Sequence, residues 1–343
     1  MSLSLSSYGN SGYKRTLSDQ LQLCHLAKER HRSMTQARML LVKEHSNSLL
    51  QCLRQEGIYL YLPPFIIRLR SQSHDLAQYL SLFYKDLSFC LDSQVVHFDI
   101  ELKAESWWRQ WLSPQVRFYQ SQQAPFLAMP RHHSAILWEW GLNYCVAAKC
   151  HHYLTIHAAV VLKDGQAVVI PAPPGSGKST LCALLCCHGW QLLSDEFALI
   201  DLDNQRVQAF PRPISLKNSS IDVLKQVVAK QQISAQFSAQ FSGTSKGDIQ
   251  LLALPKAVHA DTRKTYPIKQ IVYPHYLQQP GFNCRALSKA QSLMQLVENS
   301  FNFALLGQAG FDCLTTLVDN AQHWVLDYHD FNEALNQLEL QHG

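Results

Sequence analysis

The stretch APPGSGKST, residues 172–180, decides the fold of this chain. It fits the phosphate-binding pattern G-x-x-x-x-G-K-[ST], with alanine in place of the first glycine. The apolar run AVVIP leads into it and the run LCALLCC follows it, which predicts a strand, a tight loop and a helix in that order. Such a loop points several backbone N–H groups and a helix N-terminus at one anion. The stretch therefore predicts a phosphate cradle in an α/β domain.

Each residue at the end of this loop has an expected task. Gly175 and Gly177 let the backbone approach the phosphates closely. Lys178 can reach the β- and γ-oxygens, and Ser179 can ligate Mg²⁺. The expected nucleotide-binding residues are Gly175, Ser176, Gly177, Lys178, Ser179 and Thr180. The competing interpretation is a glycine-rich turn with an incidental lysine, and the flanking strand and helix speak against it.

Two adjacent acids, Asp195 and Glu196, lie at the end of the next predicted strand, which begins WQLL. Adjacent carboxylates there can serve a metal ion and an incoming hydroxyl at once. The alternative is a solvated strand end. His157 lies on the strand LTIHAAVVL, which turns back beside the loop, so it can reach the same site. A single histidine on an apolar strand is equally often structural.

Two histidine doublets raise the question of a second metal site. They are His132 with His133 and His151 with His152. No cysteine or acid is spaced to complete a tetrahedral set of ligands around either doublet. We therefore expect surface histidines.

The composition is that of a folded protein without a strong charge bias. Of 343 residues, 47% are apolar and 16% are charged, and the net charge is +4. No global basic field argues for nucleic acid or a membrane surface as a partner. The ten cysteines show no Cys-x-x-Cys spacing, which favours free thiols in a reducing compartment. With no apolar leader and no run of about 18 to 20 apolar residues, the expected location is the cytoplasm.

The pattern along the chain predicts three parts. Residues 1–45 are serine-rich and then basic, and they read as a mobile leader, with a nucleic-acid arm as the weaker alternative and a helix near residues 17–54. Residues 46–150 contain short apolar runs around one helix near 75–84 and end in a buried linking helix, which predicts a small α+β domain. Residues 151–343 form the phosphate-loop domain, in which 237–248 reads as a mobile loop and 287–306 as one helix.

A longer segment, IHAAVVLKDGQAVVIPAPPGSGKSTLCALLCCHGWQLLSDEFALID, resembles the catalytic domain of the HPr kinase/phosphorylase superfamily. The resemblance is greatest to its HPr kinase-related kinase A group and spans roughly residues 57–276. In that family a histidine precedes the loop and an acidic pair follows the next strand, at the positions of His157, Asp195 and Glu196. The implied fold is α/β: a P-loop core of the HPr kinase/PEP carboxykinase type with a mixed sheet, plus the smaller α+β N-terminal domain.

The resemblance implies a serine kinase that uses ATP and Mg²⁺ to phosphorylate a protein or peptide. In this interpretation Lys178 and Ser179 hold the triphosphate, Asp195 is the base, Glu196 helps Ser179 to hold the metal, and His157 assists. The candidates to neutralise the transferring phosphoryl group are Arg212, Lys217 and Lys246. Ordinary surface cations are an equally good interpretation of the two lysines.

Departures from HPr kinase/phosphorylase itself narrow this expectation. That enzyme has an Asp-Asp pair where this chain has Asp195 and Glu196, and its glycine-rich signature is not recognisable here. The resemblance therefore does not extend to HPr as the substrate or to phosphorylase activity. Members of the HPr kinase-related group are often encoded beside a PqqD-like peptide chaperone, which suggests a modified-peptide pathway. A homo-oligomer is one open possibility for the assembly. Two other functions stay open: a P-loop ATPase or regulator without a phospho-acceptor, and a non-catalytic nucleotide-sensing, peptide-binding module.

Overall fold

The computed structural model describes residues 39–104, 114–173, 175–244 and 247–342. Residues 38–343 form one compact unit, distinct from residues 1–37. Most of the expected leader and most of the expected helix near 17–54 lie outside the described residues. The last residues of that leader form strand β1 (Leu40–Leu41) and the 3-10 helix η2 (Val42–His45), in which Val42 is fully buried. These residues therefore belong to the folded unit.

The first sheet of the folded unit contains the short apolar runs. Its strands and the helices between them are α2 (Ser46–Arg54), β2 (Ile58–Leu62), β3 (Phe65–Ser71), α3 (His74–Phe83), β4 (Ser88–Cys90), β5 (Phe98–Ala104), β6 (Gln115–Gln120) and β7 (Met129–Pro130). The strand order is β1-β4-β2-β3-β5-β6-β7, and only β3 and β5 run parallel. Along β3, β5 and β6 buried residues alternate with partly exposed ones, so one face of the sheet faces a core. Of the apolar run PFLAM, residues 125–129, Met129 is the residue that pairs with β6, in β7.

Helix α4 (Ser134–Lys149) follows the short 3-10 helix η3 (Arg131–His133) and is buried over most of its length, as the apolar sequence predicts. A Cβ atom on Gly141 would lie 2.0 Å from the ring of Phe118 on β6. Glycine at this position therefore allows the helix to pack closely on the sheet. The same core contains Phe210 from the following part of the chain, whose ring lies 5.2 Å from that of Phe65.

A second, mixed sheet carries the phosphate loop. Its strands are β8 (Tyr153–Lys163), β9 (Gln166–Pro171), β10 (Gln191–Ser194), β11 (Phe197–Asp201), β12 (Val207–Gln208), β17 (Thr265–Tyr266), β18 (Ile268–Tyr276), β19 (Phe282–Ala286) and β20 (Gln322–Tyr328). The order is β17-β12-β11-β8-β9-β18-β20-β19, with β10 also paired to β8. The hairpin of β8 and β9 is antiparallel, whereas β9, β18 and β20 run parallel. The expected mixed sheet is present.

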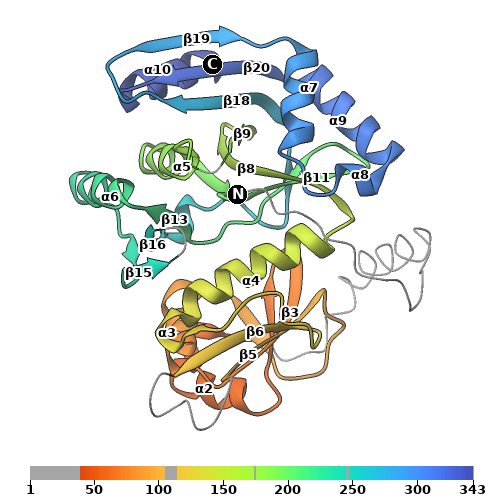
Figure 1. The fold of residues 1–343 in the computed structure, drawn as a ribbon, viewed down its shortest axis with the longest axis vertical. Coiled ribbons are helices and arrows are strands. Elements are labelled where there is room, and N and C mark those ends of the chain that lie inside the picture. Colours follow the sequence, from red (N-terminus) through yellow and green to blue (C-terminus); the bar gives the residue numbers. More distant parts are fainter. Residues whose placement is uncertain (1–38, 105–113, 174, 245–246, 343) are drawn as a thin grey trace. The chain divides into compact units, whose positions relative to one another are not determined.

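The second sheet is covered by helices on both faces (Figure 1). One face packs against α5 (Lys178–Cys187) and α10 (Phe331–His342), and α6 (Ser219–Lys230) packs in turn against α5 and the strand Ile214–Lys217. The other packs against α7 (Lys289–Glu298), α8 (Phe303–Leu306) and α9 (Gln308–Asn320). Both faces of the central strands are therefore buried, which explains why β8 and β9 read as continuous apolar runs.

The prediction of one helix over residues 287–306 is wrong, because the chain leaves the helix at Asn299 and adds to the edge of β8. The side chain of Asn302 accepts a hydrogen bond from Thr155 N and donates to the carbonyls of Cys150 and Tyr153. Backbone N–H of Phe301 donates to Thr155 O at 2.9 Å. These bonds satisfy buried backbone groups of the strand, so they favour the break over a continuous helix.

The prediction of a mobile loop over residues 237–248 is also wrong for its described part. A small antiparallel sheet forms there from β13 (Ile214–Lys217), β14 (Gln236–Phe237), β15 (Phe241–Thr244) and β16 (Gly247–Ala253), followed by the 3-10 helix η4 (Lys256–Val258). Phe241 and Ile249, which pair across it, are buried. Polar composition misled the prediction because most of the described residues from 237 to 248 are exposed or partly exposed although they lie in or between paired strands. No helix within the described residues is long and apolar enough to cross a membrane.

Candidate functional site: a phosphate loop facing an acidic pair

The phosphate loop joins the end of β9 to the start of α5, as the sequence predicts. Gly175 and Gly177 have φ angles of +91° and +88°, values at which any other residue would be strained. Gly177 is the N-cap of α5 and supplies no side chain to the helix. The first backbone N–H groups of α5 are therefore available to an anion. Pro174 lies outside the described residues.

The register of β8 brings the acidic pair level with this loop. Pro171, the last residue of β9, pairs with Ala158 on one edge of β8. On the other edge, Ser194 pairs with Val160 and Phe197 pairs with His157. The two residues between them, Asp195 and Glu196, therefore pass beside the middle of β8 without pairing to it. The break between β10 and β11, which the sequence did not predict, frees both carboxylates for other contacts.

Lys178 connects the loop to the acidic pair. Its side chain is buried, and its ammonium group donates a hydrogen bond to the backbone carbonyl of Asp195 at 2.7 Å. The same nitrogen lies 3.9 Å from Oε2 of Glu196. A buried cation thus stands between the helix N-terminus and two carboxylates.

Asp195 is the buried member of the pair. Its Oδ2 atom accepts a hydrogen bond from the backbone N–H of Ser215 at 3.4 Å. Burial raises the pKa of Asp195, and Lys178 and the side chain of Ser179 act to lower it. Its Oδ1 atom and the hydroxyl of Ser176 are buried without a hydrogen-bond partner. Unpartnered polar atoms at this place fit a bound phosphate and a cation, because buried polar groups in native proteins are rarely left unsatisfied.

Glu196 is the accessible member of the pair, with 26% of its side chain exposed. Its Oε2 lies 3.4 Å from Nε2 of His157. Burial acts to raise the pKa of Glu196, but Lys178, His157 and Arg212 together outweigh burial and lower it. His157 is fixed by a backbone bond to Asn299 O at 2.8 Å, and its ring lies 5.9 Å from that of Phe301. Glu196 is thus an ionised carboxylate at the surface of the site.

The three cations proposed for the transferring phosphoryl group have different positions. Arg212 is buried and donates to Oε2 of Glu139 on α4 at 3.1 Å and to the side chain of Asn143. Its charge lowers the pKa of Glu196, but its guanidinium is already engaged by α4. Lys217 is the partly exposed last residue of β13, and Lys246 lies outside the described residues. The site that the structure describes therefore has Lys178 as its direct cation.

The ion pair of Glu139 and Arg212 was not found from the sequence. Glu139 also accepts hydrogen bonds from the hydroxyls of Tyr79 and Tyr84, at 2.9 and 2.6 Å. Burial raises the pKa of Glu139, and Arg212 opposes that rise. A single acid inside the apolar run AILWEWGL is the signal that could have revealed it, because a buried charge needs partners.

Removing one member of this pair should strongly destabilise the protein. Replacing Arg212 by alanine leaves the Glu139 carboxylate buried without its cation, and such changes cost about 3 to 5 kcal/mol of unfolding free energy. Urea denaturation of the wild type and Arg212→Ala measures this loss. The control, Arg263→Ala, removes a fully exposed partner of Asp261 and should leave the transition unchanged. Equal midpoints for all three proteins would contradict the expected role.

The histidine doublets are more buried than expected. His133 is only 6% exposed, and its ring lies 5.6 Å from that of Phe241. The ring of His152 lies 6.1 Å from Phe65 and 4.5 Å from Tyr153. The prediction of surface histidines is wrong for His133, because the small third sheet packs on it. Within the described residues, no group of three His, Cys, Asp or Glu side chains is placed to hold a metal ion.

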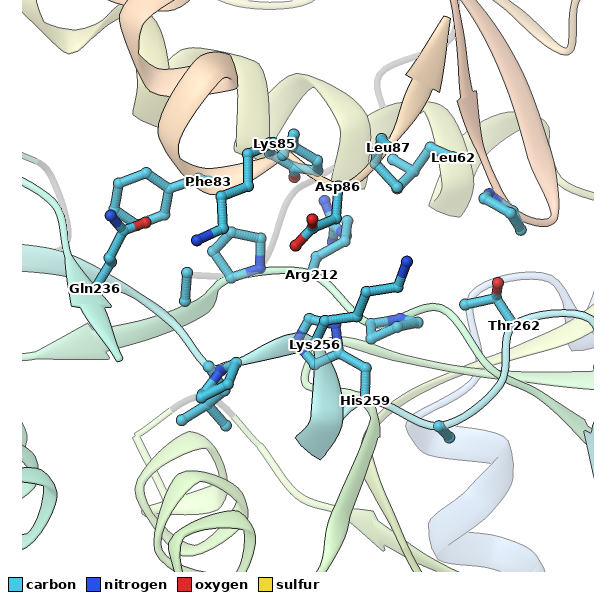
Figure 2. A pocket seen from close by; sticks show the side chains of 18 of the residues that line it. Leu62, Phe83, Lys85, Asp86, Leu87, Arg212, Gln236, Lys256, His259 and Thr262 are labelled. Atoms are coloured by element: carbon cyan, nitrogen blue, oxygen red, sulfur yellow. The ribbon is translucent and has the colours of Figure 1, made fainter. Parts of the chain in front are cut away.

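A separate cavity of about 870 Å³ lies away from the phosphate loop. Figure 2 shows Lys85 and Asp86 reaching into it from one side and Lys256 and His259 from the other. The cavity also touches Arg212, so it borders the ion pair with α4. None of the described loop residues 175–180 lines it. The candidate phosphate site and this cavity are therefore separate.

The cavity residue His259 gives a testable pH dependence. Burial lowers its pKa from 6.5 to about 4, with Asp86 acting in the opposite direction. Between these two pH values the unfolded chain binds more protons than the folded one, so the free energy of unfolding should rise with pH. The rise due to this group is up to about 3 kcal/mol. Urea midpoints at pH 4.5 and pH 7 should therefore differ more in the wild type than in His259→Gln. An identical pH dependence in both proteins would refute this assignment.

Comparisons with known proteins give a match to a family model and matches to solved structures. Residues 133–242 match the family model described as SynChlorMet cassette protein ScmC. The chain is also similar to the structure of the Hpr(Ser) kinase/phosphatase from Coxiella burnetii, with 15% sequence identity and a TM-score of 0.26, over 55% of this chain and 87% of that one. No curated protein matches the chain.

Proposed function

We propose that this chain is a kinase that transfers the γ-phosphate of ATP to a hydroxyl group. The observation that carries the proposal is Lys178, which lies in the phosphate loop and contacts the acidic pair at the same time. The loop supplies N–H groups for the β- and γ-phosphates, and the lysine supplies the charge. Phosphoryl transfer depends mostly on such positioning and electrostatic stabilisation.

Mg²⁺ is proposed as the cofactor, and Ser179 and Asp195 are the residues that would hold it. Although burial raises the pKa of Asp195, the side chain of Ser179 acts to lower it, and the unpartnered Oδ1 atom of Asp195 supports this assignment. When bound, the ion would neutralise negative charge on the phosphate oxygens. This assigns the metal to Asp195, whereas the sequence favoured Glu196.

Glu196 is the proposed base. It is the exposed member of the pair and is ionised, so an incoming hydroxyl can reach it. In the reaction, the acceptor oxygen forms a bond to the γ-phosphorus, the bond to the bridging β–γ oxygen breaks, ADP leaves, and the hydroxyl proton passes to Glu196. His157, which contacts Glu196, orients the carboxylate. The sequence had favoured Asp195 as base, but that residue is buried and accepts a hydrogen bond from Ser215 N, so an incoming hydroxyl reaches it less easily.

The proposed acceptor is a serine of a protein or peptide in the cytoplasm, and the proposed partner is a PqqD-like chaperone. The support is the resemblance carried by His157, the loop and the acidic pair. Hydrolysis is the competing outcome, with water in place of the serine hydroxyl.

Phosphate transfer from γ-labelled ATP in a lysate of the source organism tests the proposal. We expect a labelled protein or peptide with the wild type and none with Lys178→Ala. Release of free phosphate alone, equally sensitive to the substitution, would replace the kinase by an ATPase. If neither labelling nor release of phosphate occurs, the kinase and the ATPase are both refuted.

A further inference from the structure

The order of strands around β9 indicates the direction in which a bound nucleotide would extend from the phosphate loop. The acidic pair lies on the β8 side of β9, whereas β18 and β20 lie on the other side, parallel to β9. In parallel α/β sheets ligands bind beyond the carboxyl ends of the strands. If the γ-phosphate faces Asp195 and Glu196, the rest of the nucleotide extends toward the ends of β18 and β20. This step rests on the proposed function.

Tyr276 is the last residue of β18 and lies beside the phosphate loop. A Cβ atom on Gly177 would be 3.5 Å from the Cβ of Tyr276 and 3.8 Å from the hydroxyl of Tyr328, the last residue of β20. Tyr276 is 49% exposed, whereas Tyr328 is buried. An exposed aromatic ring thus borders the loop on the side away from the acids.

The ring of Tyr276 is held in place by its neighbours. It stacks on His329 with centroids 5.9 Å apart and an angle of 21° between planes, and it meets Tyr328 edge-on at 5.8 Å. Nδ1 of His329 is bonded to Leu277 O at 2.9 Å, and Leu277 N donates to Tyr328 O at 2.7 Å. These two hydrogen bonds hold the segment after β18 against the segment after β20. His329 thereby stays stacked on one face of the Tyr276 ring.

We infer that Tyr276 is the platform on which the purine base of the nucleotide stacks. A rigid aromatic ring with one face covered loses little freedom on binding. Stacking of a base on an aromatic side chain changes affinity by about 5- to 150-fold, the equivalent of about 1 to 3 kcal/mol. The site would thus separate two functions: the loop and Lys178 hold the phosphates, and Tyr276 holds the base.

Calorimetric titration of the full chain with MgATP and with magnesium tripolyphosphate, which has no base, tests this inference. Tyr276→Ala should weaken MgATP binding about 5- to 150-fold and leave tripolyphosphate binding unchanged. Tyr276→Phe should bind both ligands like the wild type. Phe282→Ala, which removes another exposed aromatic ring from the edge strand β19, is the matched control and should change neither.

The outcomes separate the inference from the proposed function. Unchanged MgATP affinity in Tyr276→Ala, or an equal loss for both ligands, would overturn the stacking role. A wild type that binds neither ligand would instead overturn the phosphate site. If Tyr276→Ala fails to fold, Tyr276→Trp provides the second measurement: its fluorescence should change with MgATP and not with tripolyphosphate. A Trp signal that responds to both ligands or to neither would contradict stacking.

Discussion

Replacing Lys178 with alanine should lower the rate of phosphate transfer or release from ATP by at least about 100- to 1,000-fold. The ammonium group is the direct cation of the site, and it lies between the loop and both carboxylates. Without it, the negative charge of the phosphates would meet the charge of Glu196 uncompensated. The repulsion would act on nucleotide binding as well as on the transition state. KM should therefore rise, and kcat should fall.

Steady-state assays with γ-labelled ATP measure this effect, and circular dichroism checks that the variant folds. Lys289→Ala is the matched control, because that exposed lysine pairs with Asp319 and lies on α7, away from the loop. Its rate should equal that of the wild type. A Lys178→Ala rate within threefold of the wild type would mean that the loop does not carry the chemistry.

Local sequence was sufficient for the parts of the site that lie close together in the chain. The strand β9, the loop and α5 are consecutive, and their pattern of apolar residues and glycines predicts each of them. Asp195 and Glu196 could be placed because β8, β9 and β10 are neighbours along the chain as well as in the sheet. Short connections leave few alternative arrangements.

Contacts between distant segments could not be predicted in the same way. Arg212 forms an ion pair with Glu139, which lies 73 residues earlier in the chain. No residue near Arg212 in the sequence indicates that partner. Helix α7 ends at Glu298, and the chain after it is held by Asn302, whose side chain bonds to Thr155, 147 residues earlier. Tyr276 reaches the loop only through the order of strands, which the apolar pattern of β18 does not specify. Tertiary contacts override local preference at each of these places.

Glu196→Gln should separate catalysis from nucleotide binding. Removing the base should lower the transfer rate about 100- to 10,000-fold, while the affinity for MgATP stays within a few-fold of the wild type. Asp195→Asn should act differently, because Asp195 is the proposed metal ligand together with Ser179. That variant should need a higher Mg²⁺ concentration for half-maximal rate, and Glu196→Gln should not. Equal Mg²⁺ requirements in both variants would contradict the division of roles.

The pH profile gives an independent test of Glu196. Although burial acts to raise its pKa, Lys178, His157 and Arg212 outweigh burial and lower it, so the wild-type carboxylate stays ionised as the pH falls to about 5. His157→Ala removes one of these three groups and should raise the pKa of Glu196. The acid limb of the transfer rate should then move to higher pH in His157→Ala, whereas His275→Ala, which removes an exposed histidine paired with Asp327, should keep the wild-type profile. If His157→Ala lowers the rate equally at every pH, the histidine does not act through the charge of Glu196.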